Sequence, residues 1–519
     1  MSPTDQKIHD RRWWTLAILS LSLLVISLDN TILNVGLPTI DRDLHATASQ
    51  LQWIVDAYML VFAGLLLTAG SLGDRLGRRK ALFTGLVVFG LGSMASAMSG
   101  SAGMLIASRA LMGIGAAFVM PSTLSILTNV FPDGERGKAI GIWAAVAGLG
   151  IAIGPVAGGW LIENASWHWI FLVNIPFVFA ALAAGAFLVP ESKDPDASPL
   201  DPIGAGLSMA GLTSLLWAII EAPSRGWTDG LILGAFGLAV VLLSVFVSWE
   251  RRTDHPMLDV KLFRNPRFSA ASVSITLVFF SLMGMIFFLT QYLQYVLQYD
   301  PLEAGIRIAA VAIGMIVGGP LSARLTEKLG TKVMVAAGLT LVAGGLMLFS
   351  GVGEDTSYGI VFVALVVMGF GMASAMAPAT DSIMGSLPLA RASVGSAVND
   401  TTRMVGGALG VAVLGSLLSS GYGAHMDGAV SQLPAGAASI AHDQLGGALL
   451  VSQNIGGQAG QALADAARTA FLSGMHTAAI VAAGVALTGA LLAALFLPAR
   501  AASKERREAV DRRLERVPA

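Results

Sequence analysis

Apolar stretches of about 20 residues recur along this chain, and their repetition restricts its possible folds more than any other feature. A helix needs about 20 apolar residues to cross a bilayer, because each residue adds about 1.5 Å along the axis. Only 13% of the residues are charged, whereas a soluble domain carries roughly 25%. Fourteen spans are predicted, over residues 14–35, 51–72, 81–98, 104–127, 139–161, 170–189, 203–220, 231–249, 268–289, 308–325, 333–351, 359–379, 394–418 and 478–497. We therefore expect an all-α integral membrane protein.

Lysine and arginine are distributed unevenly between the two sides that these spans define. With the N-terminus in the cytoplasm, 26 of the 32 basic residues fall in cytoplasmic segments and 4 in external ones. Short cytoplasmic loops are enriched in basic residues, so both termini are predicted to be cytoplasmic in a bacterial-type plasma membrane. The basic C-terminal tail is interpreted as a solvated end and not as a nucleic-acid surface.

Residues that would support catalysis or metal binding are scarce. The chain has no cysteine, which excludes disulfides, thiol chemistry and cysteine-ligated metals. Its seven histidines are scattered without the spacing of metal ligands. No P-loop pattern is present, so ATP is not the expected energy source. We expect neither an enzyme nor a bound metal or cofactor.

Three ionisable side chains interrupt the predicted spans at a similar depth. Asp29, Asp56 and Arg109 lie about five or six residues from the external ends of the first, second and fourth spans. A charge inside the bilayer costs about 2.5–3.5 kcal/mol on insertion scales, and such residues usually face a bundle interior or a wet cavity. One interpretation is an acid–base pair that locks helices together. The other, which we favour for Asp29, is a site for protons or cationic ligands.

A third acid lies in the thirteenth span, nearer the cytoplasmic end. Asp400 precedes Arg403 by three residues, so both side chains lie on the same helical face. Two hypotheses remain open for Asp400, a pair with Arg403 or an acidic contact for substrate that enters from the cytoplasm.

Two turns in corresponding places share a sequence pattern. GSLGDRLGRRKAL begins at Gly70 after the second span, and GPLSARLTEKLGTKV follows the tenth span without an acid equivalent to Asp74. Such an internal repeat indicates two homologous helical halves. In the fifth span, Gly150, Gly154 and Gly158 recur every four residues, which predicts a close packing face or a hinge.

Five segments together, LDNTILNVGLP, GSLGDRLGRRK, LIASRALMGIGAA, GLGIAIGPVAGG and WHWIFLVNIP, resemble the fourteen-helix drug:proton antiporter branch of the major facilitator superfamily. The resemblance covers nearly the whole chain. It implies an N-terminal six-helix bundle (1–195), two inserted helices (196–255) and a C-terminal six-helix bundle (256–519).

The resemblance also implies roles for particular residues. Arg109 belongs to the proton-coupling motif, and Asp29 and Asp56 would serve coupling or cation recognition. The gating and conformational residues would be Gly70, Gly73, Asp74, Arg75, Gly77, Arg78 and Arg79 in the cytoplasmic turn, and Gly150, Gly154, Pro155, Gly158 and Gly159 in the antiporter motif.

The function expected from these motifs is proton-coupled efflux of lipophilic cations such as quaternary ammonium compounds, dyes and antiseptics. A dedicated self-resistance exporter of one antibiotic or other small metabolite would share every motif. The expected partners are these substrates, protons and the lipid bilayer, with no nucleic acid, and the resemblance suggests a monomer. Residues 419–476 are predicted to form either an amphipathic helical hairpin outside the membrane or a disordered segment.

Overall fold

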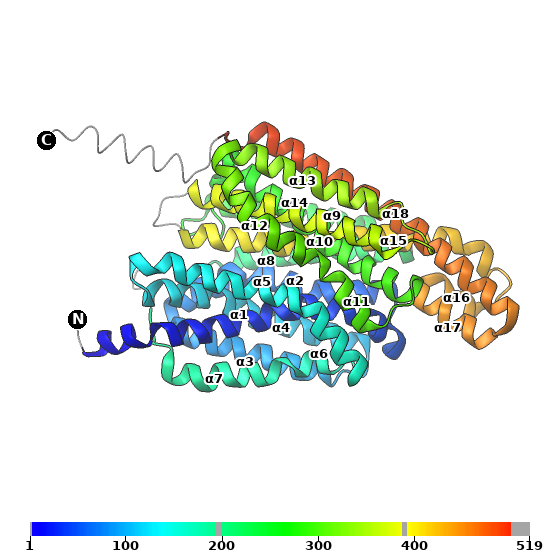
Figure 1. The fold of residues 1–519 in the computed structure, drawn as a ribbon, viewed down its shortest axis with the longest axis horizontal. Coiled ribbons are helices and arrows are strands. Elements are labelled where there is room, and N and C mark those ends of the chain that lie inside the picture. Colours follow the sequence, from blue (N-terminus) through cyan, green and yellow to red (C-terminus); the bar gives the residue numbers. More distant parts are fainter. Residues whose placement is uncertain (1–2, 194–199, 387–391, 500–519) are drawn as a thin grey trace. The chain divides into compact units, whose positions relative to one another are not determined.

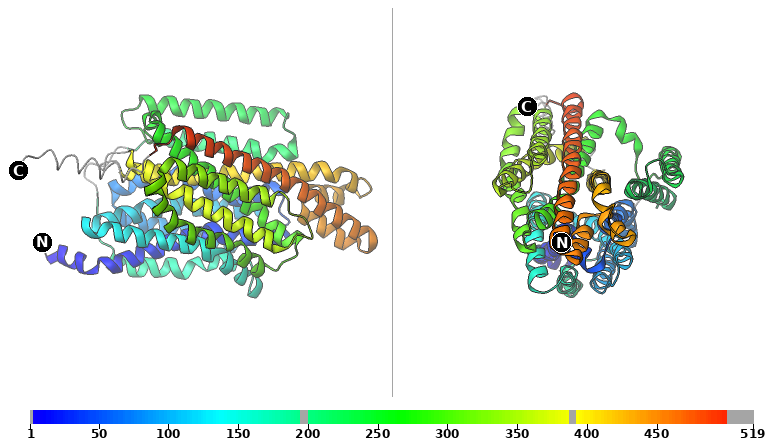
Figure 2. Two further views of the ribbon diagram at one scale, coloured as in Figure 1. Left: turned by 45° about the horizontal axis from the view of Figure 1, so that its top comes forward. Right: turned by 90° about the vertical axis from the view of Figure 1, so that its right-hand side faces the viewer.

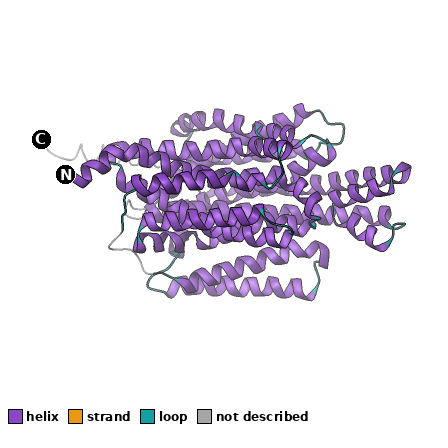
Figure 3. Ribbon diagram, turned by 90° about the horizontal axis from the view of Figure 1, so that it is seen from below, coloured by secondary structure: helices purple, strands orange, loops and turns teal. Residues whose placement is uncertain are grey.

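The structure is a computed structural model that describes residues 3–193, 200–386 and 392–499. Within these residues every regular element is helical (Figure 3). Fourteen helices in the described part of the chain are long and apolar enough to cross a membrane, which confirms the predicted class and number of spans.

The described residues fall into two compact units. Unit 1 comprises Met1–Leu258, Ile286–Ala309 and Gly415–Gly474, and unit 2 comprises Asp259–Met285, Ala310–Leu414 and Met475–Ala519. Three long helices therefore contribute residues to both units. These are α10 (Pro266–Gln291), α15 (Ala392–Val430) and α18 (Gly457–Phe496).

Unit 1 contains the first helices of the chain, coloured from dark blue to teal in Figure 1. α1 packs on α5 and α7, and α4 packs on both α2 and α3. Their bounds are α1 (Pro3–Leu44), α2 (Ala48–Leu76), α3 (Arg78–Ala97), α4 (Ala102–Val130), α5 (Asp133–Asn164), α6 (Trp169–Leu172) and α7 (Asn174–Leu188).

The seventh and eighth predicted spans are α8 (Pro202–Arg225) and α9 (Gly230–Arg252). They pack on each other as two adjacent green helices (Figure 2). Asp201 caps the first of them by accepting a hydrogen bond from Gly204 N, and Asp229 caps the second through Leu231 N. These caps satisfy amide groups that a helix start leaves without an intrahelical partner.

Unit 2 contains three helices from the second half of the chain that pack on one another. α14 (Tyr358–Gly385) packs on α12 (Ala310–Leu329) and on α13 (Thr331–Phe349). The tenth span has a break, because α11 (Pro301–Ile308) ends before α12 begins. The two turns that share a sequence pattern each contain a glycine with positive φ, since Gly77 has φ +126° and Gly330 has φ +86°. Side chains with a Cβ atom rarely adopt such angles.

The segment 419–476 is helical, so the disorder alternative is wrong. α15 continues to Val430, and the chain then forms α16 (Ala435–Asp443) and α17 (Leu445–Ile455) before α18 begins. These two short helices pack on each other at the right-hand end of Figure 1. Gly456 and Gly457, with φ +64° and +61°, break the helix between α17 and α18.

Candidate functional site

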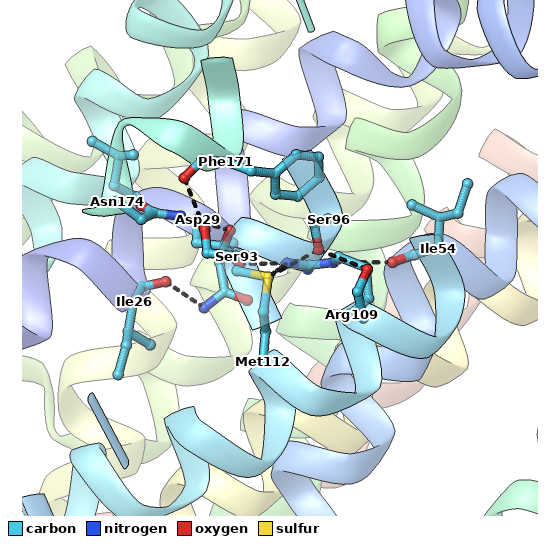
Figure 4. Close-up of polar contacts among 12 residues, drawn as sticks. Ile26, Asp29, Ile54, Ser93, Ser96, Arg109, Met112, Phe171 and Asn174 are labelled. Carbon is cyan, nitrogen blue, oxygen red and sulfur yellow. Dashed lines mark hydrogen bonds and ion pairs between the residues drawn. The ribbon is translucent and has the colours of Figure 1, made fainter. Parts of the chain in front are cut away.

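A buried ion pair joins α1 to α4. Arg109 Nη1 lies 2.6 Å from Asp29 Oδ2, and the two side chains are 2% and 0% exposed (Figure 4). Arg109 also donates from Nε to the carbonyl of Ile54 at 3.2 Å and lies 4.3 Å from the ring centre of Tyr58. The guanidinium therefore holds α1, α2 and α4 together, and the acid–base pair proposed as one interpretation of Asp29 is present.

The sequence of α4 explains why this helix comes so close to α2. A Cβ atom at Gly113, one turn beyond Arg109, would lie 2.7 Å from the Tyr58 carbonyl oxygen. Real Cβ atoms essentially never come that close, so glycine is required for the approach that lets Arg109 reach Ile54.

We expect Gly113→Ala to lower the thermal midpoint of the purified protein, because the added methyl group forces α4 away from α2. The expected destabilisation is about 1–3 kcal/mol, as for other overpacked cores. Gly103→Ala is the matched control on the same helix, since a Cβ atom there would meet nothing within 4 Å. Equal midpoints for the two variants would show that the close approach is not needed.

An asparagine completes the surroundings of Asp29. Asn174 donates from Nδ2 to Asp29 Oδ1 at 3.4 Å and to Ser93 Oγ at 3.1 Å. Ser93 in turn donates to the carbonyl of Phe171 at 2.8 Å. Its single hydroxyl proton is thereby used, so Ser93 must accept from Asn174, and this fixes which end of the amide faces Asp29. Sequence reasoning gave Asn174 no role, although the residue lies in the quoted segment WHWIFLVNIP.

Asp56 lies on α2 but does not take part in this cluster. Its side chain is 0% exposed, and neither carboxylate oxygen has a hydrogen-bond partner in the described part of the chain. Ile54 and Tyr58, which flank it, contact Arg109. The depth argument placed Asp29, Asp56 and Arg109 in one layer, and the structure joins two of them while leaving Asp56 apart.

In the turn after α2, Asp74, Arg78 and Arg79 make polar contacts. Asp74 Oδ1 lies 2.7 Å from Arg78 Nε, and Arg79 Nη2 donates to the carbonyl of Ala186 at 2.7 Å. Arg75 is exposed. Glu191, which sequence reasoning missed, accepts a hydrogen bond from Arg79 N at 3.2 Å. Glu191 follows α7, so the turn is held against the end of a helix that lies more than 100 residues further along the sequence.

The glycines of that turn are sites of close approach. A Cβ atom at Gly77 would lie 2.7 Å from Glu191 Oε1, one at Gly73 would lie 3.0 Å from Ala81 Cβ, and one at Gly70 would lie 3.3 Å from Pro121 Cβ.

The glycine stripe of α5 lies against α1. Cβ atoms at Gly150, Gly154 and Gly158 would come within 3 Å of Ser27, Thr31 and Ile32 respectively. Another face of α5 contacts α11, because a Cβ atom at Gly159 would lie 2.4 Å from the Pro301 carbonyl and one at Gly305 would lie 2.1 Å from the Pro155 carbonyl. The packing face expected from the sequence therefore lies against α1, and a second face of α5 packs on α11.

Asp400 belongs to unit 2. Its Oδ1 lies 3.9 Å from Arg403 Nη1 on the same helix, with 12% of the Asp400 side chain exposed. The long distance makes this a weak ion pair, and Asp400 keeps capacity for a further cationic partner.

Comparison with known proteins gives a consistent result. The profile of the Major Facilitator Superfamily matches residues 19–411. The chain is 35% identical to the multidrug efflux pump LfrA of Mycolicibacterium smegmatis, over 94% of this chain and 97% of that protein. It is 34% identical to the tetracenomycin C resistance and export protein of Streptomyces glaucescens, over 94% and 92%. It is also 32% identical to the methyl viologen resistance protein SmvA of Salmonella typhimurium, over 91% and 96%.

Solved structures agree in fold. A bacterial homologue of the human lysosomal transporter Spinster, in an inward-facing and unoccupied conformation, superimposes with a TM-score of 0.64 at 18% identity. The match covers 95% of this chain and 98% of that one.

Proposed function

Because the chain belongs to the major facilitator superfamily, we propose that it exports lipophilic cations from the cytoplasm in exchange for protons. Its curated relatives are multidrug or antibiotic resistance efflux proteins. The observation that carries the proposal is Asp56, a fully buried carboxyl group with no hydrogen-bond partner among the described residues.

Such a carboxyl group is stable within a membrane only when its charge is balanced. Ionised and alone it costs several kcal/mol, and a bound proton or a bound cation removes that cost. The two ligands exclude each other, because both neutralise the same negative charge. Competition at Asp56 therefore links the release of a drug cation to the uptake of a proton.

The neighbouring ion pair leaves Asp56 as the residue that sets the net charge of the group. Arg109 neutralises Asp29, so the net charge of the three residues depends on Asp56. With Asp56 ionised the net charge is negative and favours a cation, and with Asp56 protonated that attraction is lost. Each proton that moves down a 100 mV potential supplies about 2.3 kcal/mol to the cycle.

We further propose an orientation with both termini in the cytoplasm, which the distribution of lysine and arginine supports. The turn after α2 is then cytoplasmic, and the connection between α1 and α2 is external. The ion pair of Asp74 and Arg78 would break and form as the transporter changes state. Asp400 would contact substrate that enters from the cytoplasm.

A second candidate function is export of one antibiotic by a self-resistance pump. Relatives named for resistance to tetracenomycin C and to puromycin favour it. The same Asp56 chemistry would serve a single cationic substrate.

A resistance panel separates these functions. Cells that express the chain should tolerate ethidium, tetraphenylphosphonium and methyl viologen better than control cells, and collapse of the proton gradient should remove the difference. Energised inverted vesicles should accumulate the same cations. Protection against a single antibiotic would select the second candidate, and protection that persists without a gradient would exclude proton coupling.

A further inference from the structure

Two cavities in unit 1 share three lining residues, Ser419, Gln444 and Asp443, and Asp443 is the last residue of α16. The wider cavity has a volume of about 830 Å³ and lies between the α1–α2 connection, the end of α8, the end of α15 and the two short helices α16 and α17. The narrower one has a volume of about 20 Å³ and lies between α2, α10, α15 and the start of α17. Asp443 borders both cavities.

The wider cavity reaches solvent, because side chains at its border such as Asp427 and Trp227 are exposed. The narrower one is large enough for a single water molecule, which needs about 10–15 Å³ of such volume and two to four polar partners. Gln52, Gln291 and Tyr422 border it and supply polar groups.

Gln52 is the most informative of these side chains. It is 1% exposed, and its Oε1 has no hydrogen-bond partner among the described residues. Room for it comes from Gly415, where a Cβ atom would lie 2.8 Å from Gln52 Cδ. A buried amide oxygen without a partner beside a water-sized cavity is satisfied when a water molecule there donates to it.

Asp56 follows Gln52 by four residues on the same helix. Residues four apart lie on one helical face, with about 5–6 Å between their Cβ atoms. The buried carboxyl group assigned to proton exchange is therefore one helical turn from the narrower cavity.

Asp443 has the properties of a proton acceptor at the entrance. Burial raises the pKa of its carboxyl group above the ordinary value, although a hydrogen bond from Ala48 N and the charge of His442 partly offset this effect. That hydrogen bond, to Oδ2 at 2.9 Å, joins the end of α16 to the first residue of α2. The other titratable groups that face Asp443 are Glu221 on α8, Asp41 on α1 and Tyr422 on α15.

We propose that Asp443 and Gln52 form the external entrance of the proton path to Asp56. A proton from external water binds the Asp443 carboxylate, moves to water in the narrower cavity and passes to the Asp56 carboxylate, which leaves Asp443 ionised again. Gln52 is a positioning residue that orients this water through Oε1. The proposal rests on the proposed function, since it needs Asp56 as the proton acceptor.

The test uses the full-length protein with two readouts. Proton release on addition of ethidium to the detergent-solubilised protein reports the competition at Asp56 at equilibrium. The initial rate of ethidium transport in proteoliposomes, measured against external pH, reports proton entry. Asp443→Asn retains an oxygen that accepts from Ala48 N, so the hydrogen bond to the first residue of α2 is preserved. Gln52→Leu removes the amide that orients water in the narrower cavity, and Gln52→Glu restores an oxygen at that position.

We expect Asp443→Asn and Gln52→Leu to release protons like the wild type but to transport at least about 10-fold more slowly near neutral external pH, as for loss of a proton-transfer group. The rate of Asp443→Asn should also depend less on external pH, while Gln52→Glu should recover most of the wild-type rate. Asp465→Asn is the matched control and should transport like the wild type, because Asp465 is exposed, is paired with Arg468 and borders neither cavity.

Wild-type transport rates in both Asp443→Asn and Gln52→Leu would overturn the entrance while leaving Asp56 as the exchange site. Slow transport together with lost proton release would show general damage and would also overturn it. Asp56→Asn is measured alongside as the reference: if that variant still releases protons, the proposed function itself fails.

Discussion

Asp56→Asn should abolish drug-induced proton release and reduce proton-driven export by at least about 100-fold, within the range found for loss of a proton-transfer group. Asparagine has the shape of aspartate but neither gains nor loses a proton at physiological pH. The variant therefore binds no proton at this position, and a drug cation has nothing to displace. Proton release on addition of ethidium, together with transport into inverted vesicles, measures both effects.

The same substitution should leave the fold intact. Asp56 makes no hydrogen bond to any described residue, so none is lost, and a neutral amide is less costly to bury than an ionised carboxylate. We expect a thermal midpoint at least equal to that of the wild type. Asp465→Asn is the control, since Asp465 is exposed and paired with Arg468. Proton release at the wild-type level in Asp56→Asn would contradict the assignment.

Arg109→Gln should destabilise the protein severely and stop transport. Removal of the guanidinium leaves the Asp29 carboxylate buried without its cation, and breaking a buried ion pair in this way costs about 3–5 kcal/mol. The hydrogen bond to the Ile54 carbonyl is weakened as well. Thermal unfolding in detergent measures the stability, and ethidium transport measures the function.

The double variant Asp29→Asn with Arg109→Gln separates charge from packing. It removes both charges, so it should be more stable than Arg109→Gln alone, with a coupling energy of about 1–3 kcal/mol between the two positions. Transport should stay absent in the double variant. Strictly additive destabilisation would show that the two side chains do not interact in the working protein.

The membrane-spanning architecture could be predicted because a bilayer imposes a length and a composition on each helix. The second span, predicted over 51–72, lies within the helix Ala48–Leu76. The same argument gives no helix length outside the bilayer. The thirteenth span was predicted to end at residue 418, whereas α15 continues to Val430. Alanine and glycine there are compatible with helix or coil, and only packing decides between them.

The site was predictable in part for a similar physical reason. Charged residues are rare in apolar helices because burying a charge costs free energy, so Asp29, Asp56 and Arg109 stood out in the sequence. Depth along a helix does not give the direction of a side chain, and the sequence did not show that Arg109 pairs with Asp29 and not with Asp56. Asn174 was missed because a neutral amide interrupts an apolar stretch less than a charge does.

The contacts of α16 and α17 also bear on how the chain is made. Asp443 binds the Ala48 amide across 395 positions of sequence, and Gln444 binds Asp41 across 403. A ribosome that adds 5–20 residues per second needs roughly 20–80 s between these partners. The earliest helices must therefore wait in the bilayer, already inserted, until nearly all of the polypeptide has been translated. The contacts that close this bundle therefore form late, only after Asp443 and Gln444 have been synthesised.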